Sequence, residues 1–215
     1  MAFLKSSPNL DQPDIHMTLM ESLVDSRFFH FMPGCKIEIL KMLQPPTGGR
    51  GFLLMPTALQ LKSRGRVRLR SRDYQASLII DPGFLTEHSD VDLLVSSIRL
   101  TQAMIKTEPM RKIGAQLDDR KLPGCEDQEY DSDDYWWCYV RHFAATAHHG
   151  SGTCKMGPAD DATAVVDSRL RVKGIKGLRV ADASTMPLVV SANTNAGTIM
   201  IAEKAADLIK EDNKH

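Results

Sequence analysis

The chain has 215 residues, which is enough for one well-formed hydrophobic core or two small ones. Its composition, 42% hydrophobic and 25% charged with 27 basic and 27 acidic side chains, is that of an ordinary globular protein and indicates no nucleic-acid or membrane-surface partner. The longest apolar runs, such as GFLLM from Gly51, are far shorter than the ~20 residues that span a bilayer, so we expect no membrane-spanning segment.

The N-terminal stretch and the cysteines bear on the cellular compartment. The first residues, MAFLKSSPNLDQPDIHM, carry two early prolines and no sustained apolar run, so they do not read as a secretory signal and, taken literally, place the chain in the cytosol. No two of the four cysteines form a C-x-x-C pair, which argues against a zinc ribbon. Cys125 and Cys138 flank an acidic loop and could bridge in an oxidising compartment, although free buried thiols are favoured. The compartment stays open.

The first half of the chain reads as strands between loops. We expect surface loops at QPPTGGRG (residues 44–51) and at the acidic CEDQEYDSDD (residues 125–134). In GRVRLRS, Val67 and Leu69 alternate with arginines, which predicts a half-buried strand. GFLLMPTALQL and QASLIIDP are expected as its neighbours in one sheet.

The arginines of this region have a second interpretation, because a row of basic side chains can line a nucleic-acid groove. The strand has no interleaved aromatic residues and the chain has no basic excess, so a solvated strand face is favoured. The basic residues are Lys62, Arg64, Arg66, Arg68, Arg70 and Arg72.

Three amphipathic helices follow. Ser89 is expected to cap the first, with Val91, Leu94, Val95 and Ile98 on its apolar face. The second starts at Ser132 and is predicted to deliver the chain to His148, with an apolar stripe of Trp136, Val140, Phe143 and Ala147. The third starts near Asn193 and is predicted to turn inward the side chains Ile199, Ala202, Ala206 and Ile209. Before it, RLRVKGIKGLRVADAS predicts a hairpin or strand pair around Gly174 and Gly177.

The segment HHGSGTCKMG (residues 148–157) carries the chemistry. It does not complete a dinucleotide fingerprint, because Lys155 stands where the third small residue is needed and a helix precedes it. A zinc site from His148, His149 and Cys154 lacks further ligands. A catalytic base needs a histidine held by a rigid turn, and glycines beside His149 permit one. From these residues alone, an ordinary turn histidine is favoured.

Six segments together resemble the glucose-methanol-choline (GMC) oxidoreductases, most closely the insect glucose-dehydrogenase-type branch. The resemblance runs from about Pro13 to Ile209. It rests on LQLKSRGRVRLRS, LIIDPGFLTEHSDVDLLVSSIRL, YWWCYVRHFAATAHH, HHGSGTCKMG, AVVDSRLRVKGIKGLRVADASTMP and SANTNAGTIMIAEKAADLI, in this order.

The resemblance implies the site residues. The family's H-x-x-G-T-C pattern makes His149 the catalytic base, and the family's second catalytic position falls on Asn193. The D-x-S-x-x-P turn starting at Asp182 is implied to lie against the ribityl and pyrophosphate region of FAD. The implied cofactor-binding residues are Asp182, Ala183, Asn193, Thr194 and Asn195, and no metal is implied.

The resemblance also implies fold and function. We expect an α+β chain with an antiparallel substrate-domain sheet and flanking helices (residues 1–145), followed by a catalytic segment with the last strand and helix of an FAD-binding domain (residues 146–215). The implied reaction is oxidation of the CH-OH group of a small alcohol, in which His149 takes the proton and hydride passes to flavin N5.

The sequence departs from the family in three ways. Gly150 and Gly197 stand where many relatives have proline, and none of the 14 glycines completes the G-x-G-x-x-G fingerprint of the family's N-terminal Rossmann part. An N-terminal FAD-binding half is therefore an expected partner, and apolar surface between Leu178 and Ile209 is expected to be exposed without it. The parent protein is compatible with secretion. The alternative is a non-catalytic GMC-derived domain acting as a binding or regulatory module; substrate and electron acceptor stay open.

Overall fold

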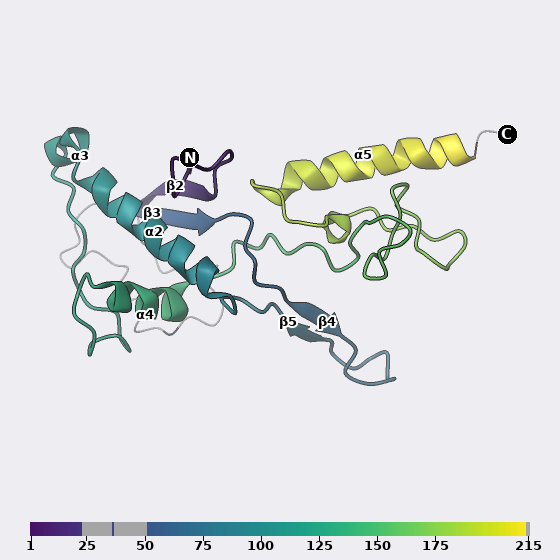
Figure 1. Ribbon diagram of the computed structural model, residues 1–215, viewed down its shortest axis with the longest axis horizontal. Helices are drawn as coiled ribbons and strands as arrows, with labels where there is room; N and C mark the ends of the chain where they lie inside the picture. Colours follow the sequence, from purple (N-terminus) through teal and green to yellow (C-terminus); the bar gives the residue numbers. More distant parts are fainter. Residues whose placement is uncertain (23–35, 37–50, 214–215) are drawn as a thin grey trace. The chain divides into compact units, whose positions relative to one another are not determined.

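The computed structural model describes residues 1–22, 36 and 51–213 (Figure 1). The expected loop at residues 44–50 and Cys35 lie outside the described residues. The chain divides into two compact units. Unit 1 comprises Met1–Ser63 and Leu85–Thr146, and unit 2 comprises Arg64–Phe84 and Ala147–His215. The expected domain division after residue 145 stays a prediction about the parent protein.

Unit 1 is built on an antiparallel sheet in the order β1 (Ala2–Leu4), β2 (Ile15–Ser22), β3 (Gly51–Ala58). Ile15 lies opposite Ala58 in the register, and His16 lies opposite Phe3, on whose ring it stacks at a centroid distance of 4.8 Å. Three consecutive residues of β2, from Ile15 to Met17, are buried. Because neighbouring residues of a strand point to opposite faces, both faces of the sheet are covered here.

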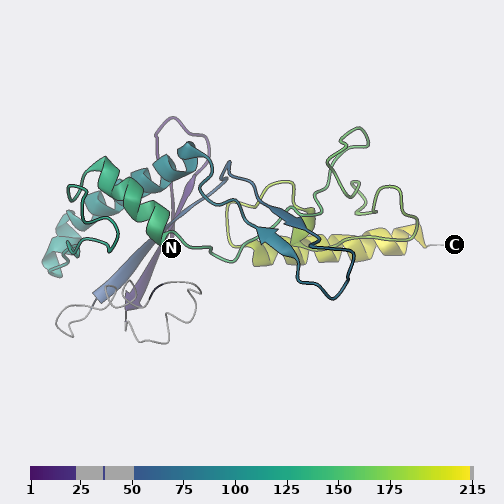
Figure 2. The same cartoon turned by 90° about the horizontal axis from the view of Figure 1, so that it is seen from below.

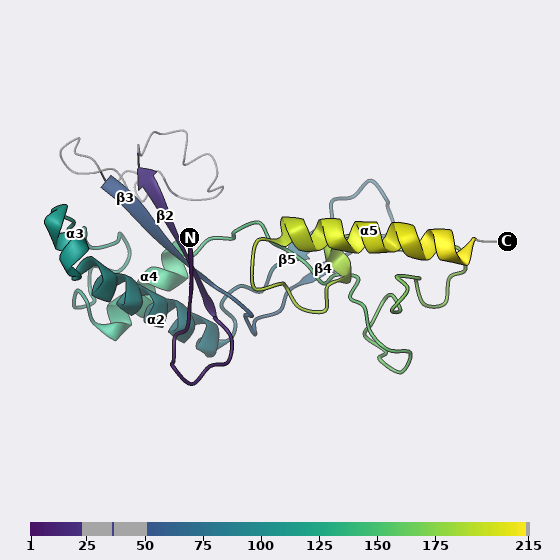
Figure 3. The same ribbon diagram turned by 90° about the horizontal axis from the view of Figure 1, so that it is seen from above.

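Helix α2 (His88–Ile105) packs against β3, helix α4 (Asp133–Phe143) packs against α2, and the short α3 (Glu108–Lys112) lies between them in sequence (Figure 3). The predicted inner face of α2 is confirmed, since Val91 and Val95 are buried and Leu94 and Ile98 pack against the same core. This core contains Val91, Val95, Leu122, Cys125, Tyr135, Trp136 and Val140. The predicted start of α4 at Ser132 is also confirmed: Ser132 is the N-cap, and its hydroxyl accepts from the N–H of Tyr135 at 3.0 Å.

The start of α2 differs from the expectation. The helix begins at His88 and its N-cap is Glu87, not Ser89. The buried carboxylate of Asp90 accepts from the backbone N–H groups of Lys62 (2.9 Å) and Ser63 (2.7 Å). The first turn of α2 therefore holds the chain where it leaves β3, and this long-range contact decides the helix start.

The predicted extension of the second helix to Ala147 and His148 is wrong. Helix α4 ends at Phe143, and the backbone of Ala144 is extended. The side chains of residues 144–148 are exposed. With no packing surface to stabilise them, further helical turns gain little, because helices in proteins are held mainly by tertiary contacts.

A disulfide joins Cys125 to Cys138, so the expectation of free thiols is wrong for this pair. The Cα atoms are 5.9 Å apart, within the usual range for a disulfide. The loop before α4 is brought to the helix by a hydrogen bond from the N–H of Leu122 to the hydroxyl of Tyr135 (3.1 Å). This contact between loop and helix, which the spacing of the cysteines does not reveal, places the two sulfurs together.

The β4–β5 hairpin of unit 2 departs from the predicted single sheet. Among the described residues, strand β4 (Arg66–Arg68) pairs with β5 (Ile79–Asp81) in a two-stranded antiparallel sheet (Figure 2), whereas β3 belongs to the three-stranded sheet. Val67 is 44% exposed and Leu69 is 77% exposed, so the predicted half-buried face is wrong among the described residues. A two-stranded sheet without a second layer cannot bury either face. The arginines of β4 are solvent-exposed, as expected.

The core of unit 2 lies between helix α5 (Thr194–Asp212) and irregular loops. The predicted inward face of α5 is wrong, because Ile199 and Ile209 are exposed while Ile201, Ala205 and Leu208 are buried. Both faces of this helix carry apolar residues, so its periodicity alone could not select the packed one. The packed core consists of Val166, Leu170, Met186, Ile201, Ala205 and Leu208.

The predicted strand pair around Gly174 and Gly177 exists only as isolated bridges, Val166 with Val172 and Arg171 with Arg179. The expected exposure of apolar surface in this region is confirmed. The exposed side chains include Leu178, Leu188, Ile199, Met200 and Ile209.

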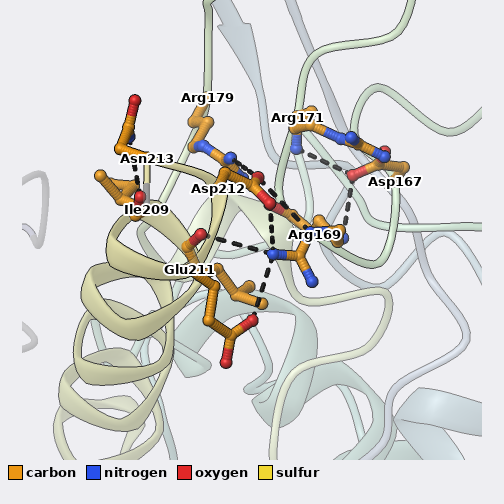
Figure 4. A network of polar contacts seen from close by, with 9 residues as sticks. Asp167, Arg169, Arg171, Arg179, Ile209, Glu211, Asp212 and Asn213 are labelled. Atoms are coloured by element: carbon orange, nitrogen blue, oxygen red, sulfur yellow. Dashed lines mark hydrogen bonds and ion pairs between the residues drawn. The ribbon is translucent and has the colours of Figure 1, made fainter. Parts of the chain in front are cut away.

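An ionic network fixes the C-terminal end of α5 to this irregular hairpin (Figure 4). Arg169 pairs with Asp212 at 2.6 Å and with Glu211 at 3.2 Å, and Arg179 also pairs with Asp212. Hydrogen bonds from Arg169 and then from Arg179 hold the pKa of the Asp212 carboxyl below its usual value. Asp167 begins a turn, and its carboxylate accepts from the N–H of Arg169 at 2.9 Å. No local pattern in the sequence predicts the ion pairs of Arg169, because its partners lie about forty residues further along the chain.

We expect the disulfide to stabilise unit 1 substantially. The double substitution C125A/C138A should lower the free energy of unfolding by about 3 kcal/mol, since a crosslink that closes a loop of about 15 residues removes that much chain entropy from the unfolded state. Urea unfolding followed by tryptophan fluorescence reports on unit 1, because both tryptophans, Trp136 and Trp137, lie in α4. Cys154→Ala, in unit 2, is the matched control and should leave the transition unchanged. Equal midpoints for the wild type and the double variant would contradict the expectation.

Candidate active site

The segment that carries His149 lies beside the turn that follows Asp182. The N–H groups of Gly152, Cys154 and Met156 donate to the carbonyls of Ala183 (3.3 Å), Ser184 (2.9 Å) and Thr185 (2.9 Å). The alternate residues of one segment thus bond successive residues of a one-turn 3₁₀ helix, Ala183–Thr185. Two segments about thirty residues apart in the chain are joined by backbone bonds.

Asp182 stabilises this turn from within. Its carboxylate accepts from the N–H of Ser184 at 2.8 Å and also from the Ser184 hydroxyl. The Asp182 side chain therefore acts as the N-cap of the 3₁₀ helix. Thr185 is fully buried, and its hydroxyl donates to the carbonyl of Asp182 at 2.8 Å. The D-x-S pair of the predicted flavin-binding turn thus has a local structural role.

Gly152 is required where the segment bends. Its φ is +85°, a left-handed conformation that side chains disfavour, and a Cβ here would lie 3.2 Å from the carbonyl oxygen of Met186. Gly150 has open space around it. His148 has a φ of +59° and an exposed side chain. The chain therefore turns sharply on both sides of His149.

His149 is brought to the start of α5. Its Nδ1 lies 3.1 Å from the hydroxyl oxygen of Thr194, the first residue of the helix, and the imidazole is half-buried. The hydroxyl either accepts from an Nδ1–H or donates to a bare Nδ1, according to the tautomer. Residues 45 positions apart in the sequence are joined here.

Asn193, the N-cap residue of α5, precedes Thr194 directly and is solvent-exposed. Its side chain makes no capping hydrogen bond, so the carboxamide is not used to cap the helix. Asn195 is also exposed. Of the predicted residues, the structure thus brings His149 to Thr194, next to Asn193, and joins the His149 segment to Ala183 and the Asp182 turn.

The N-terminal end of α5 is suited to bind an electron-rich group. The helix has 19 residues, and the first N–H groups of any α-helix lack intrahelical acceptors and carry a partial positive charge. The first turn contains no acidic residue that would neutralise this charge. Backbone donors, a free carboxamide and an imidazole are a donor set that fits the polar edge of a flavin ring.

The family of the chain follows from sequence comparison. A family profile described as GMC oxidoreductase matches residues 62–202. The chain belongs to this family.

Two relatives illustrate the likeness. The chain is 44% identical over 161 residues to the glucose dehydrogenase [FAD, quinone] of Drosophila melanogaster, which covers 75% of this chain and 26% of that protein. It is 37% identical over 212 residues to the mitochondrial choline dehydrogenase of Homo sapiens, covering 97% of this chain and 32% of that protein. The chain spans 26% to 36% of the length of such curated relatives.

Solved structures of related proteins have the same fold. A formate oxidase of Aspergillus oryzae RIB40 superposes with a TM-score of 0.73 at 26% identity, over 95% of this chain and 32% of that chain. The pyridoxine 4-oxidase of Mesorbium loti matches with a TM-score of 0.73 over 100% of this chain and 38% of that chain; at 24% identity this shows the fold alone. No helix among the described residues is long and apolar enough to cross a membrane.

The role of Gly152 in the backbone pairing with residues 183–185 can be tested, with Gly150 as the matched control. Gly152→Ala should expose the amides of Cys154 and Met156 to roughly tenfold faster hydrogen exchange, because an alanine in the left-handed region costs about 1–2 kcal/mol. Gly150→Ala, at a position without positive φ or close neighbours, should leave exchange unchanged. Equal exchange rates in the two variants would show that the pairing does not depend on Gly152.

Proposed function

We propose that this chain supplies the catalytic base and part of the flavin environment of an FAD-dependent enzyme that oxidises the CH-OH group of a small alcohol. Membership in the GMC oxidoreductases and the names of the relatives, glucose dehydrogenase [FAD, quinone] and choline dehydrogenase, support the reaction class. The observation that supports this location of the active site is the contact between His149 and Thr194 at the start of α5.

The residues of the site take complementary roles in this proposal. His149, through Nε2, accepts the hydroxyl proton of the alcohol, and the exposed carboxamide of Asn193 donates a hydrogen bond to the same oxygen. When bound, FAD accepts the hydride from the alcohol carbon. Asn193, Thr194 and Asn195, in the N-terminal turn of α5, would hold the polar edge of the flavin ring, and Asp182 and Ala183 would bind on the ribityl side.

We propose that Thr194 orients the imidazole of His149, in addition to lying next to the flavin. If Nδ1–H of His149 donates to the Thr194 hydroxyl, Nε2 is left unprotonated and able to accept a proton. The same contact limits rotation of the ring, so that Nε2 keeps one direction. A base contributes only when its acceptor atom lies within hydrogen-bond reach of the proton it takes.

The reaction also needs residues that hold the adenosine and pyrophosphate of FAD. No glycine cluster in this sequence completes the dinucleotide fingerprint, so we propose that an FAD-binding N-terminal half acts together with this chain. Exposed apolar side chains near the N-terminal end of α5 could pack against such a partner. They belong to Leu188, Ile199 and Met200. The other candidate role, a non-catalytic module, predicts protein that gains no flavin when such a half is supplied.

The central test replaces His149. The chain is expressed together with the N-terminal FAD-binding half of an insect glucose dehydrogenase, and reduction of the flavin by alcohols is followed by absorbance. His149→Ala should slow reduction by roughly 10²- to 10⁴-fold while flavin content stays the same, which is the usual contribution of a general base. His148→Asn is the matched control, because asparagine tolerates the left-handed backbone at this position and should retain the rate. Equal rates for both variants would exclude His149 as the base.

The role of Thr194 is tested separately. Thr194→Val removes the hydroxyl and keeps the shape, so the rate of flavin reduction should fall roughly two- to tenfold, the value of one hydrogen bond. Thr194→Ser should restore the rate. Because the hydroxyl acts on the base and not on the substrate, kcat should fall and KM should not change. A serine variant as slow as the valine variant would assign Thr194 a purely structural role.

A further inference from the structure

Unit 1 contains a cluster of metal-ligating atoms that the proposed reaction does not use. Within the described residues, the ligand atoms of Cys125, Cys138 and His142 all lie within 4.8 Å of one another. His142 Nδ1 is 3.8 Å from Cys125 Sγ and 3.6 Å from Cys138 Sγ. In this structure the sulfurs of Cys125 and Cys138 form a disulfide.

The geometry points to a redox-gated Zn²⁺ site formed by Cys125, Cys138 and His142, which is closed while the disulfide is intact and forms when the disulfide is reduced. Two ligands of a tetrahedral Zn²⁺, one sulfur at about 2.3 Å and one nitrogen at about 2.05 Å, lie roughly 3.6 Å apart. The imidazole nitrogen already has this separation from both sulfurs. Only the two sulfurs must move apart, to roughly 3.8 Å.

The local structure keeps the ligands together after reduction. Cys138 and His142 are one helical turn apart on α4, so their side chains share a face. The loop that carries Cys125 is held independently of the disulfide: Leu122 donates to the Tyr135 hydroxyl, and Lys121 Nζ donates to the carbonyls of Glu126 (2.9 Å) and Gln128 (2.6 Å). The loss of one covalent bond therefore does not disperse the three ligands.

Gly124 lies beside the imidazole of His142. Its φ is +94°, and a Cβ at this position would lie 3.6 Å from Nε2 and Cδ2 of His142. The ring thus lies over a backbone that only glycine adopts readily. His142 Nδ1 is also 2.9 Å from the carbonyl of Cys138, a contact that requires the proton on Nδ1. Binding of Zn²⁺ at Nδ1 moves this proton to Nε2, which can donate to water because His142 is exposed.

A dithiol can reduce the disulfide between Cys125 and Cys138. One thiolate of the dithiol attacks a sulfur of the bridge and breaks the Sγ–Sγ bond; its second thiol closes to a cyclic disulfide and releases both cysteines as thiols. Zn²⁺ then binds the sulfurs as thiolates, which releases two protons, and binds Nδ1 of the neutral imidazole. The fourth position is left to water.

The ligand types favour zinc. The loop between the cysteines contains acidic residues, CEDQEYDSDD in residues 125–134, of which Asp131 and Asp133 pair with Arg99. Thiolate and imidazole ligands select Zn²⁺ over Mg²⁺ and Ca²⁺, which prefer oxygen. All three ligands belong to unit 1, whereas His149, Asn193 and Thr194 belong to unit 2.

The experiment uses the full chain with Co²⁺ as a spectroscopic probe for the Zn²⁺ site. The protein is reduced with tris(2-carboxyethyl)phosphine, which takes up one water oxygen as it converts the bridge to two thiols, and is then titrated with Co²⁺ and Zn²⁺. We expect a thiolate-to-cobalt charge-transfer absorption in the reduced protein only, its loss when Zn²⁺ is added, and no loss with Mg²⁺. Zn²⁺ should also raise the urea midpoint of the reduced protein, read by tryptophan fluorescence, and not that of the oxidised protein.

Matched variants assign the ligands. Cys138→Ser should abolish the charge-transfer absorption, and His142→Ala should weaken binding by at least roughly 100-fold, beyond the usual effect of residues around a metal site. His88→Ala, another unit 1 histidine, and Cys154→Ala, a free cysteine, should bind as the wild type does. Absence of the absorption in the reduced wild type, equal binding by the oxidised protein, or loss of binding in Cys154→Ala would each overturn the proposal.

Discussion

Unit 2 depends on the backbone pairing between the His149 segment and the turn that follows Asp182. The N–H groups of Gly152, Cys154 and Met156 have their acceptors on this turn, and the turn is closed by Asp182 and Ser184. Between residues 156 and 179 the loops of unit 2 form isolated bridges, so these bonds take the place of a regular sheet there. Because they fix the backbone after His149, the imidazole can reach Thr194 from a segment with little secondary structure of its own.

The same unit leaves one side of α5 without a packing layer among the described residues. Ile201, Ala205 and Leu208 are buried against Val166, Leu170 and Met186, while Ile199 and Ile209 are exposed. At the far end, the pairs from Arg169 and Arg179 to Asp212 tie the helix to the hairpin. Both arginines are half-buried, and both pair with the same carboxylate in the last turn of the helix. The N-terminal end of α5 is thus positioned by the buried face of the helix and by contacts at both of its ends.

Unit 1 is organised differently, around a small aromatic core crossed by a disulfide. Tyr135 and Trp136 pack edge to face with ring centroids 4.9 Å apart, and the hydroxyl of Tyr135 accepts from the loop that carries Cys125. The indole N–H of Trp136 donates to Asp131 at 2.8 Å, so its polar atom is satisfied as well. Helix, loop and bridge therefore stabilise one another, and the histidine one turn after Cys138 is carried to the sulfurs by the same packing.

Four features could be predicted from the amino-acid sequence: the family, the α+β class with antiparallel strands, the start of α4 at Ser132 and the inner face of α2. These features are written in local patterns: a capping residue, a helical period, and motifs in a set order. The tertiary structure alone decided the disulfide, the end of α4, the separation of β3 from the β4–β5 hairpin and the buried face of α5. Each of these depends on which surfaces meet. Periodicity shows that Ile199 and Ile201 both lie on apolar faces of one helix, but only the loops that pack against Ile201 determine which of them is removed from water.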